Sequence, residues 1–158
     1  MRKRKGFKLS VITLLTVFLL AIGASSASAA AGWGDTFETA EVMYRANIQE
    51  SSFYSATVPL DGSWDSDFYV VDNIWGSSTF SFYVIATPPP AFDLVLFVYK
   101  MNANDNILSI EAIDYNGKGI AESGGFGINP GEKIYFRVMD NGISDYSKPY
   151  TIEFRKTS

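Results

Sequence analysis

The sequence predicts an all-β fold, an antiparallel, jelly-roll-like β-sandwich of about eight strands. Segments in which apolar residues alternate recur about every 10 to 14 residues, and turn-forming residues separate them. No sustained helical period follows the N-terminal segment, which disfavours alternating strands and helices. The part of the chain after this N-terminal segment has about 130 residues, a length typical of one domain with one core.

The N-terminal segment predicts a secretory signal peptide over residues 1–29. Five of the first eight residues are basic, an apolar run continues to Ala24, and small residues at Ala27 and Ala29 suit a signal peptidase. We expect cleavage after Ala29, with Ala31 as the second choice, and a single domain over residues 30–158. The alternative is an N-terminal membrane anchor, because the apolar run is close to spanning length. The small residues favour cleavage, hence a secreted, extracellular protein without stable membrane insertion afterwards.

The elements follow in order along this domain. Segment 34–43 is the only helix-like one, where Asp35 or Thr36 can cap a single turn. Strands are expected at 45–49, 53–58, 68–72, 79–86, 94–101, 107–113, 134–139 and 150–155. The Gly-rich residues 124–127 predict a flexible loop or bulge.

Alternation within these strands indicates which side chains face the core. Segment 79–86 places Phe80, Phe82 and Val84 on one face, and the last strand directs Tyr150, Ile152 and Phe154 inward. Segment 94–101 is apolar on both faces, which favours a central strand or one with an aromatic outer face.

Composition narrows the possible functions. The chain has no Cys and no His, so disulfides and both serine–histidine and cysteine–histidine catalysis are excluded. The predicted signal contains five of the 13 basic residues and none of the 17 acidic ones. Its removal would therefore leave a net charge of 8 − 17 = −9. Such a charge disfavours nucleic acid as a partner and suits a cation or a basic surface.

Four motifs in a fixed order resemble the bacterial pre-peptidase C-terminal domain, which is related to the collagen-binding domains of secreted collagenases. These motifs are GDTFETA at 34–40, DSDFY at 65–69, FDLVLFVY at 92–99, and PGEKIYFRV at 130–138 with YTIEF at 150–154. The resemblance covers most of residues 30–158. It implies a β-sandwich that serves as a non-catalytic binding module rather than an enzyme.

The acidic loop 61–67 is the best candidate site. Calcium takes six to eight oxygen ligands, which alternating carboxylates and loop carbonyls supply. The resemblance implies that Asp35, Glu38, Asp65 and Asp67 would hold calcium between the N-terminal segment and this loop. The alternative is that Asp65 and Asp67 accept hydrogen bonds from the N–H groups of their own turn. A glycosidase carboxylate pair is a further interpretation that nothing else in the sequence supports.

Aromatic residues supply the second candidate site. Tyr83, Tyr99 and Tyr135 are predicted to point outward and would form a flat binding strip if their strands are neighbours in one sheet. Trp64 and Trp75 lie in predicted loops, where they either bind a ligand or close the ends of the core.

These residues lead to two functional hypotheses. The first is a secreted binding module that engages extracellular protein or cell-wall polysaccharide through an aromatic sheet face, with calcium ordering its N-terminal segment. The alternative is a structural or interaction protein of the cell envelope or matrix, or the partner of a separate secreted protease.

Overall fold

A computed structural model describes residues 34–142 and 145–158, so the expected signal peptide lies outside the described residues. The described part forms nine strands and no helix, and therefore contains no helix able to cross a membrane. The strands are β1 (Glu41–Arg45), β2 (Phe53–Val58), β3 (Ser66–Asp72), β4 (Phe80–Thr87), β5 (Leu94–Asn102), β6 (Ile107–Ile113), β7 (Glu122–Ile128), β8 (Glu132–Asp140) and β9 (Tyr150–Lys156).

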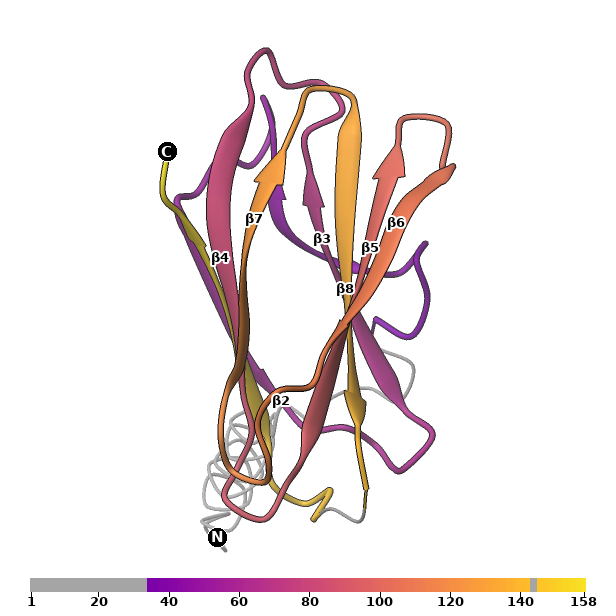
Figure 1. The fold of residues 1–158 in the computed structure, drawn as a ribbon, viewed down its shortest axis with the longest axis vertical. Coiled ribbons are helices and arrows are strands. Elements are labelled where there is room, and N and C mark those ends of the chain that lie inside the picture. The colour runs from indigo at the N-terminus through magenta and orange to yellow at the C-terminus, as the bar shows by residue number, and fades with distance from the viewer. Residues whose placement is uncertain (1–33, 143–144) are drawn as a thin grey trace, which may run out of the picture. The chain divides into compact units, whose positions relative to one another are not determined.

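Two sheets face each other, as the prediction of a β-sandwich requires (Figure 1). One sheet has five strands in the order β1-β3-β8-β5-β6, and the other has four in the order β2-β9-β4-β7. Neighbouring strands are antiparallel except β1 and β3, which run parallel. The parallel pair arises because the chain crosses to the other sheet for β2 before it returns as β3.

The core lies between the sheets and confirms the predicted alternation. Phe80, Phe82 and Val84 of β4 are buried there, while their neighbours Ser81 and Tyr83 are exposed. In β9, Tyr150, Ile152 and Phe154 are buried as expected. β5 lies between β8 and β6 and is apolar on both faces, which confirms its place inside the sheet.

A second, smaller apolar cluster lies on the outer face of the five-stranded sheet. Val70, Met101 and Tyr135 form its buried part, and Phe37 of the N-terminal segment packs on it. The hydrogen bond from Phe68 N to Gly34 O, 2.6 Å long, fixes the start of this segment against β3. The N-terminal segment is therefore part of the sandwich and covers a sheet face.

The structure corrects three predicted elements. Residues 36–39 form a turn rather than a helical turn that continues to residue 43, because β1 already begins at Glu41. The strand expected at 45–49 is wrong: β1 ends at Arg45, and residues 46–48 form a turn in which Asn47 adopts a positive φ of 63°. The Gly-rich residues 124–127 belong to β7 and pair with β4 along its length.

Candidate functional site

Asp65 organises the acidic loop between β2 and β3. Its Oδ2 accepts a hydrogen bond from Asp61 N at 2.6 Å, and its Oδ1 accepts one from Ser66 N at 2.8 Å. These bonds hold the turn and lead the chain into β3. The alternative role expected for this residue, fixing its own turn, is thus present in the structure.

Asp67 lies at the start of β3 and points into the core, where it is only 3% exposed. Its Oδ2 accepts a hydrogen bond of 2.5 Å from the Tyr150 hydroxyl. The same Tyr150 hydroxyl lies 2.6 Å from the Tyr69 hydroxyl. Burial raises the pKa of Asp67 to about 7, against the lowering effect of the Tyr150 bond, and the negative charges of Asp65 and Asp35 raise it further.

Asp35 completes a group of three carboxylates. The backbone bond between Gly34 and Phe68 brings it beside the start of β3. One carboxylate oxygen from each of Asp35, Asp65 and Asp67 lies within 4.8 Å of the other two. Desolvation raises the pKa of Asp35, and the charges of Asp65 and Asp61 add to the effect. Mutual repulsion of this kind is what a bound cation would relieve.

The structure places Glu38 outside this group of three. It is exposed and lines a cavity on the outer face of the five-stranded sheet, where a hydrogen bond with Thr36 lowers its pKa. The carboxylates that lie within 4.8 Å of one another are those of Asp35, Asp65 and Asp67, and Glu38 is not among them. Glu38 was therefore wrongly grouped with the three aspartates.

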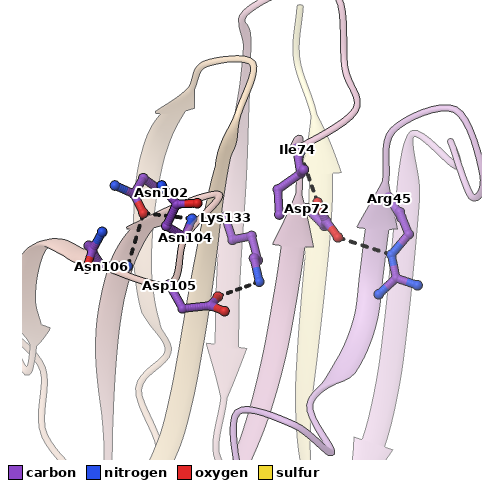
Figure 2. Close-up of polar contacts among 8 residues, drawn as sticks. All are labelled: Arg45, Asp72, Ile74, Asn102, Asn104, Asp105, Asn106 and Lys133. Atoms are coloured by element: carbon purple, nitrogen blue, oxygen red, sulfur yellow. Dashed lines mark hydrogen bonds and ion pairs between the residues drawn. The ribbon is translucent and has the colours of Figure 1, made fainter.

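The cavity beside Glu38 has a volume of about 530 Å³ and is bounded by two ion pairs (Figure 2). On the β1 side, Arg45 Nε lies 3.2 Å from Asp72 Oδ2; on the β8 side, Lys133 Nζ lies 2.7 Å from Asp105 Oδ1. Phe37 and the other members of the smaller apolar cluster form much of the lining between them.

The turn between β5 and β6 positions Asp105. Asn102 Oδ1 accepts hydrogen bonds from Asn104 N at 2.9 Å and Asn106 N at 3.0 Å, and Asp105 adopts a positive φ of 59° (Figure 2). The Asp105 bond raises the pKa of Lys133 despite the opposing effect of desolvation. This cavity was not predicted from the sequence. A usable signal was that Lys133 and Tyr135, two residues apart in β8, fall on the same outward face.

The proposed strip of three tyrosines does not exist. Tyr99 and Tyr135 are paired on neighbouring strands, but Tyr83 belongs to β4 in the other sheet. Phe37 also packs edge-on against Tyr99 and Tyr135, with ring centroids 5.3 and 5.0 Å apart. Alternation within a strand indicates which way each side chain points, but it contains no information on which sheet the strand joins.

The outer face of the four-stranded sheet carries a different aromatic row. Phe53 of β2 pairs with Arg155 of β9, Arg155 pairs with Tyr83 of β4, and Tyr83 pairs with Gly125 of β7. Phe53 and Tyr83 are 49% and 53% exposed. The row crosses all four strands at one level, and the Arg155 guanidinium lies 5.7 Å from the Phe53 ring centroid.

Both described tryptophans are at the surface. Trp64 in the acidic loop is 95% exposed, and Trp75 in the loop between β3 and β4 is 72% exposed. The alternative role considered for them, closing the ends of the core, is therefore wrong. The backbone carbonyl of Trp75 accepts a hydrogen bond from the Asn47 side chain.

Together, the fold and these sites define a small β-sandwich domain with a cluster of carboxylates beside the start of β3 and aromatic side chains on an open sheet face. No protein-family model matches the sequence, and no curated protein is detectably similar to it.

The solved structures with detectable similarity to this chain include two of low identity. The pre-peptidase C-terminal domain of a collagenase from Bacillus anthracis is 16% identical, with a TM-score of 0.42, over 75% of this chain and 94% of that one. A CocE/NonD family hydrolase from Staphylococcus aureus is 7% identical, with a TM-score of 0.32, over 68% of this chain and 31% of that one. At these values neither similarity assigns the chain to a family.

Proposed function

We propose that the chain is a secreted, non-catalytic binding module that engages an extracellular protein or a cell-wall polysaccharide. The observation that carries the proposal is the row formed by Phe53, Arg155, Tyr83 and Gly125 on the outer face of the four-stranded sheet. This row replaces the tyrosine strip as the aromatic binding face.

The geometry of the row suits a flat ligand. Phe53 and Tyr83 are two strands apart, which corresponds to about 10 Å between their backbones. Gly125 has no side chain to rise beside Tyr83, and a Cβ there would lie 3.0 Å from the Tyr83 ring. Aromatic rings that are half exposed on a rigid sheet can stack on sugar rings or on apolar parts of a polypeptide.

The polar surroundings of the row are neutral and rich in hydroxyl groups. Arg155 Nη2 lies 2.5 Å from Glu153 Oε2, so the two charges on this face compensate each other. Thr57 and Thr151 are hydrogen-bonded across the neighbouring strands at 3.0 Å. Such a face offers hydrogen bonds without attracting a strongly charged ligand, which supports a neutral polymer as the partner.

Co-sedimentation with insoluble collagen, cellulose and cell-wall material tests the proposal. We expect wild-type protein to be retained on at least one material, and the Phe53→Ala and Tyr83→Ala variants to be retained at least several-fold less. Ile48→Ala is the control, because Ile48 is exposed in the turn after β1 and lies outside the row. If only Trp64→Ala or Trp75→Ala lost binding, the binding site would lie in the loops and not on the row. If the wild type were retained on none of the materials, the proposal would be refuted.

We also propose that calcium binds Asp35, Asp65 and Asp67. Carboxylate oxygens are the ligands that calcium prefers, and the three residues join the N-terminal segment to the start of β3. A bound cation would offset the charge repulsion in the group. It would also hold the N-terminal segment, which covers the five-stranded sheet, against the start of β3.

Secretion and the domain limits stay part of the proposal. N-terminal sequencing of protein exported by an expressing host is expected to begin at residue 30, and a start at Met1 would contradict the signal peptide. The absence of His and Cys from the whole sequence supports a non-catalytic role.

A further inference from the structure

β6 forms an edge of the five-stranded sheet and is exposed on both faces. It follows β5 in the strand order, and within residues 34–142 and 145–158 no strand pairs with its other side, as the margin of the sheet in Figure 1 shows. Of its seven residues, only Ile113 is buried. One side of its backbone thus presents unpaired N–H and C=O groups to the surroundings.

Apolar side chains are concentrated along this edge. Ten large hydrophobic side chains are exposed in the described part of the chain, and five of them lie between residues 107 and 120. Ile107, Leu108 and Ile110 belong to β6 itself, and Tyr115 and Ile120 lie in the connection that follows it. An exposed apolar patch of this kind is typical of an interaction surface.

The usual protections of an edge strand are weak here. β6 contains neither Lys nor Pro, and Glu111 is its one charged residue. A register shift opposite Lys100 and Met101 distorts the beginning of the strand, but residues 109–113 pair regularly with β5. By contrast, the chain after β1 folds back at the opposite edge of the sheet, where Arg45 N donates to Gln49 O at 2.9 Å.

We infer that β6 pairs edge to edge with β6 of a second copy of this chain, in an antiparallel dimer that continues the five-stranded sheet across a two-fold axis. An extended strand is the structure that satisfies both the unpaired backbone groups and the apolar side chains of such an edge.

The sequence of β6 is compatible with pairing to itself. Ile110 is the midpoint of the strand, and a two-fold axis there brings the regularly placed residues 109–111 of the two copies opposite one another. In this register Ile110 faces Ile110, and Glu111 faces Ser109. The two Glu111 carboxylates are therefore not opposite each other, which avoids a direct contact between like charges. The two-fold arrangement closes on itself and does not lead to a fibre.

Sedimentation velocity of the exported protein between about 1 and 200 μM tests the inference. We expect a monomer–dimer equilibrium for the wild type and a shift to monomer of at least tenfold in Kd for Ile110→Lys, because two ammonium groups would meet at the axis. Ile48→Lys is the matched control and should dimerise like the wild type, since Ile48 is exposed in the turn after β1. Circular dichroism checks that each variant is folded.

Single cysteines test the register. The chain has no other Cys, so Ile110→Cys is expected to form a disulfide-linked dimer under mild oxidation. Directly opposite residues of antiparallel strands have Cα atoms about 4.5 to 5.5 Å apart, within the range of a disulfide. Glu111→Cys should cross-link several-fold more slowly.

A monomeric wild type at 200 μM, an Ile110→Lys variant that still dimerises, or equal cross-linking by both cysteines would overturn the inference. The binding row lies on the other sheet, so co-sedimentation results do not bear on this outcome.

Discussion

The Tyr150 hydroxyl donates a hydrogen bond of 2.5 Å to Asp67 Oδ2 and so joins β9 of one sheet to β3 of the other through the core. Because Tyr150 uses its proton in this bond, the Tyr69 hydroxyl at 2.6 Å acts as the donor to Tyr150. A buried carboxyl group is thereby kept at the end of a short chain of hydroxyl groups.

Replacement of Tyr150 by Phe is expected to destabilise the domain by about 1 to 3 kcal/mol, because Asp67 loses a buried hydrogen-bond donor while the ring is retained. Urea unfolding at neutral pH measures this change. Tyr83→Phe, which removes an exposed hydroxyl, should change the free energy of unfolding by no more than about 0.5 kcal/mol. Equal stabilities of Tyr150→Phe and the wild type would show that the bond contributes nothing.

Stability should fall as pH rises through the range in which Asp67 ionises. Its pKa is about 7 in the folded state and 3.8 ordinarily, so the folded state binds more protons between these values. The free energy of unfolding therefore decreases from about pH 4 to pH 7 through this group. We expect the melting temperature in chelator to drop by a few degrees between pH 5 and pH 8.

Asp67→Asn separates this residue from the other titrating groups. The variant has no charge to bury, so its melting temperature should depend less on pH than that of the wild type. A variant with the wild-type pH dependence would assign the effect to another residue, such as Asp35, whose pKa is also raised.

Most strands could be predicted because their side chains alternate clearly, as in β4 and β9. β7 could not, because Gly124 and Gly125 carry no side chain from which an inward or outward position can be read. Packing compensates for the missing side chains. A Cβ on Gly124 would lie 2.8 Å from Ile113 Cδ1, and one on Gly125 would lie 3.0 Å from the Tyr83 ring. Contacts with residues distant in sequence therefore decide this strand.

The candidate site was predictable to a similar degree. The acidic pattern around Asp65 and the family resemblance brought Asp35, Asp65 and Asp67 together in advance, and the structure places them within reach of one ion. Glu38 could not be excluded from sequence, because the direction of the turn after Asp35 depends on how Phe37 packs on β5 and β8.

Gly119 is expected to be intolerant of substitution. It has a φ of +72°, and a Cβ there would lie 2.8 Å from Pro90 Cα and 2.9 Å from Pro90 O. Gly119→Ala should therefore lower stability by about 2 kcal/mol or more. Gly117→Ala is the control, since a Cβ at Gly117 meets no atom within 4 Å. Similar urea midpoints for the two variants would contradict this close approach of the loop to Pro90.

Phe37 should contribute to stability by covering the outer face of the five-stranded sheet. Its ring centroid lies 4.8 Å from that of Phe68 and 5.0 Å from that of Tyr135, both in edge-on geometry. Phe37→Ala is expected to cost about 2 kcal/mol and to increase binding of a hydrophobic dye, because Tyr99 and Tyr135 become exposed. Trp64→Ala, which removes an almost fully exposed side chain, should do neither. Wild-type dye binding by Phe37→Ala would mean that another segment covers this face.

Calcium is expected to raise the melting temperature by several degrees relative to chelator, because a ligand at one hundred times its Kd stabilises the folded state by about 2.7 kcal/mol. The shift should increase with pH up to about 8, since Asp67 must lose its proton to bind the ion. Asp35→Asn and Asp65→Asn should reduce the shift. Glu38→Gln should leave it unchanged, because Glu38 lies outside the group of three carboxylates. Magnesium at the same concentration controls for ionic strength. An absent shift in the wild type, or one lost in Glu38→Gln but kept in Asp35→Asn, would exclude calcium binding at these three aspartates.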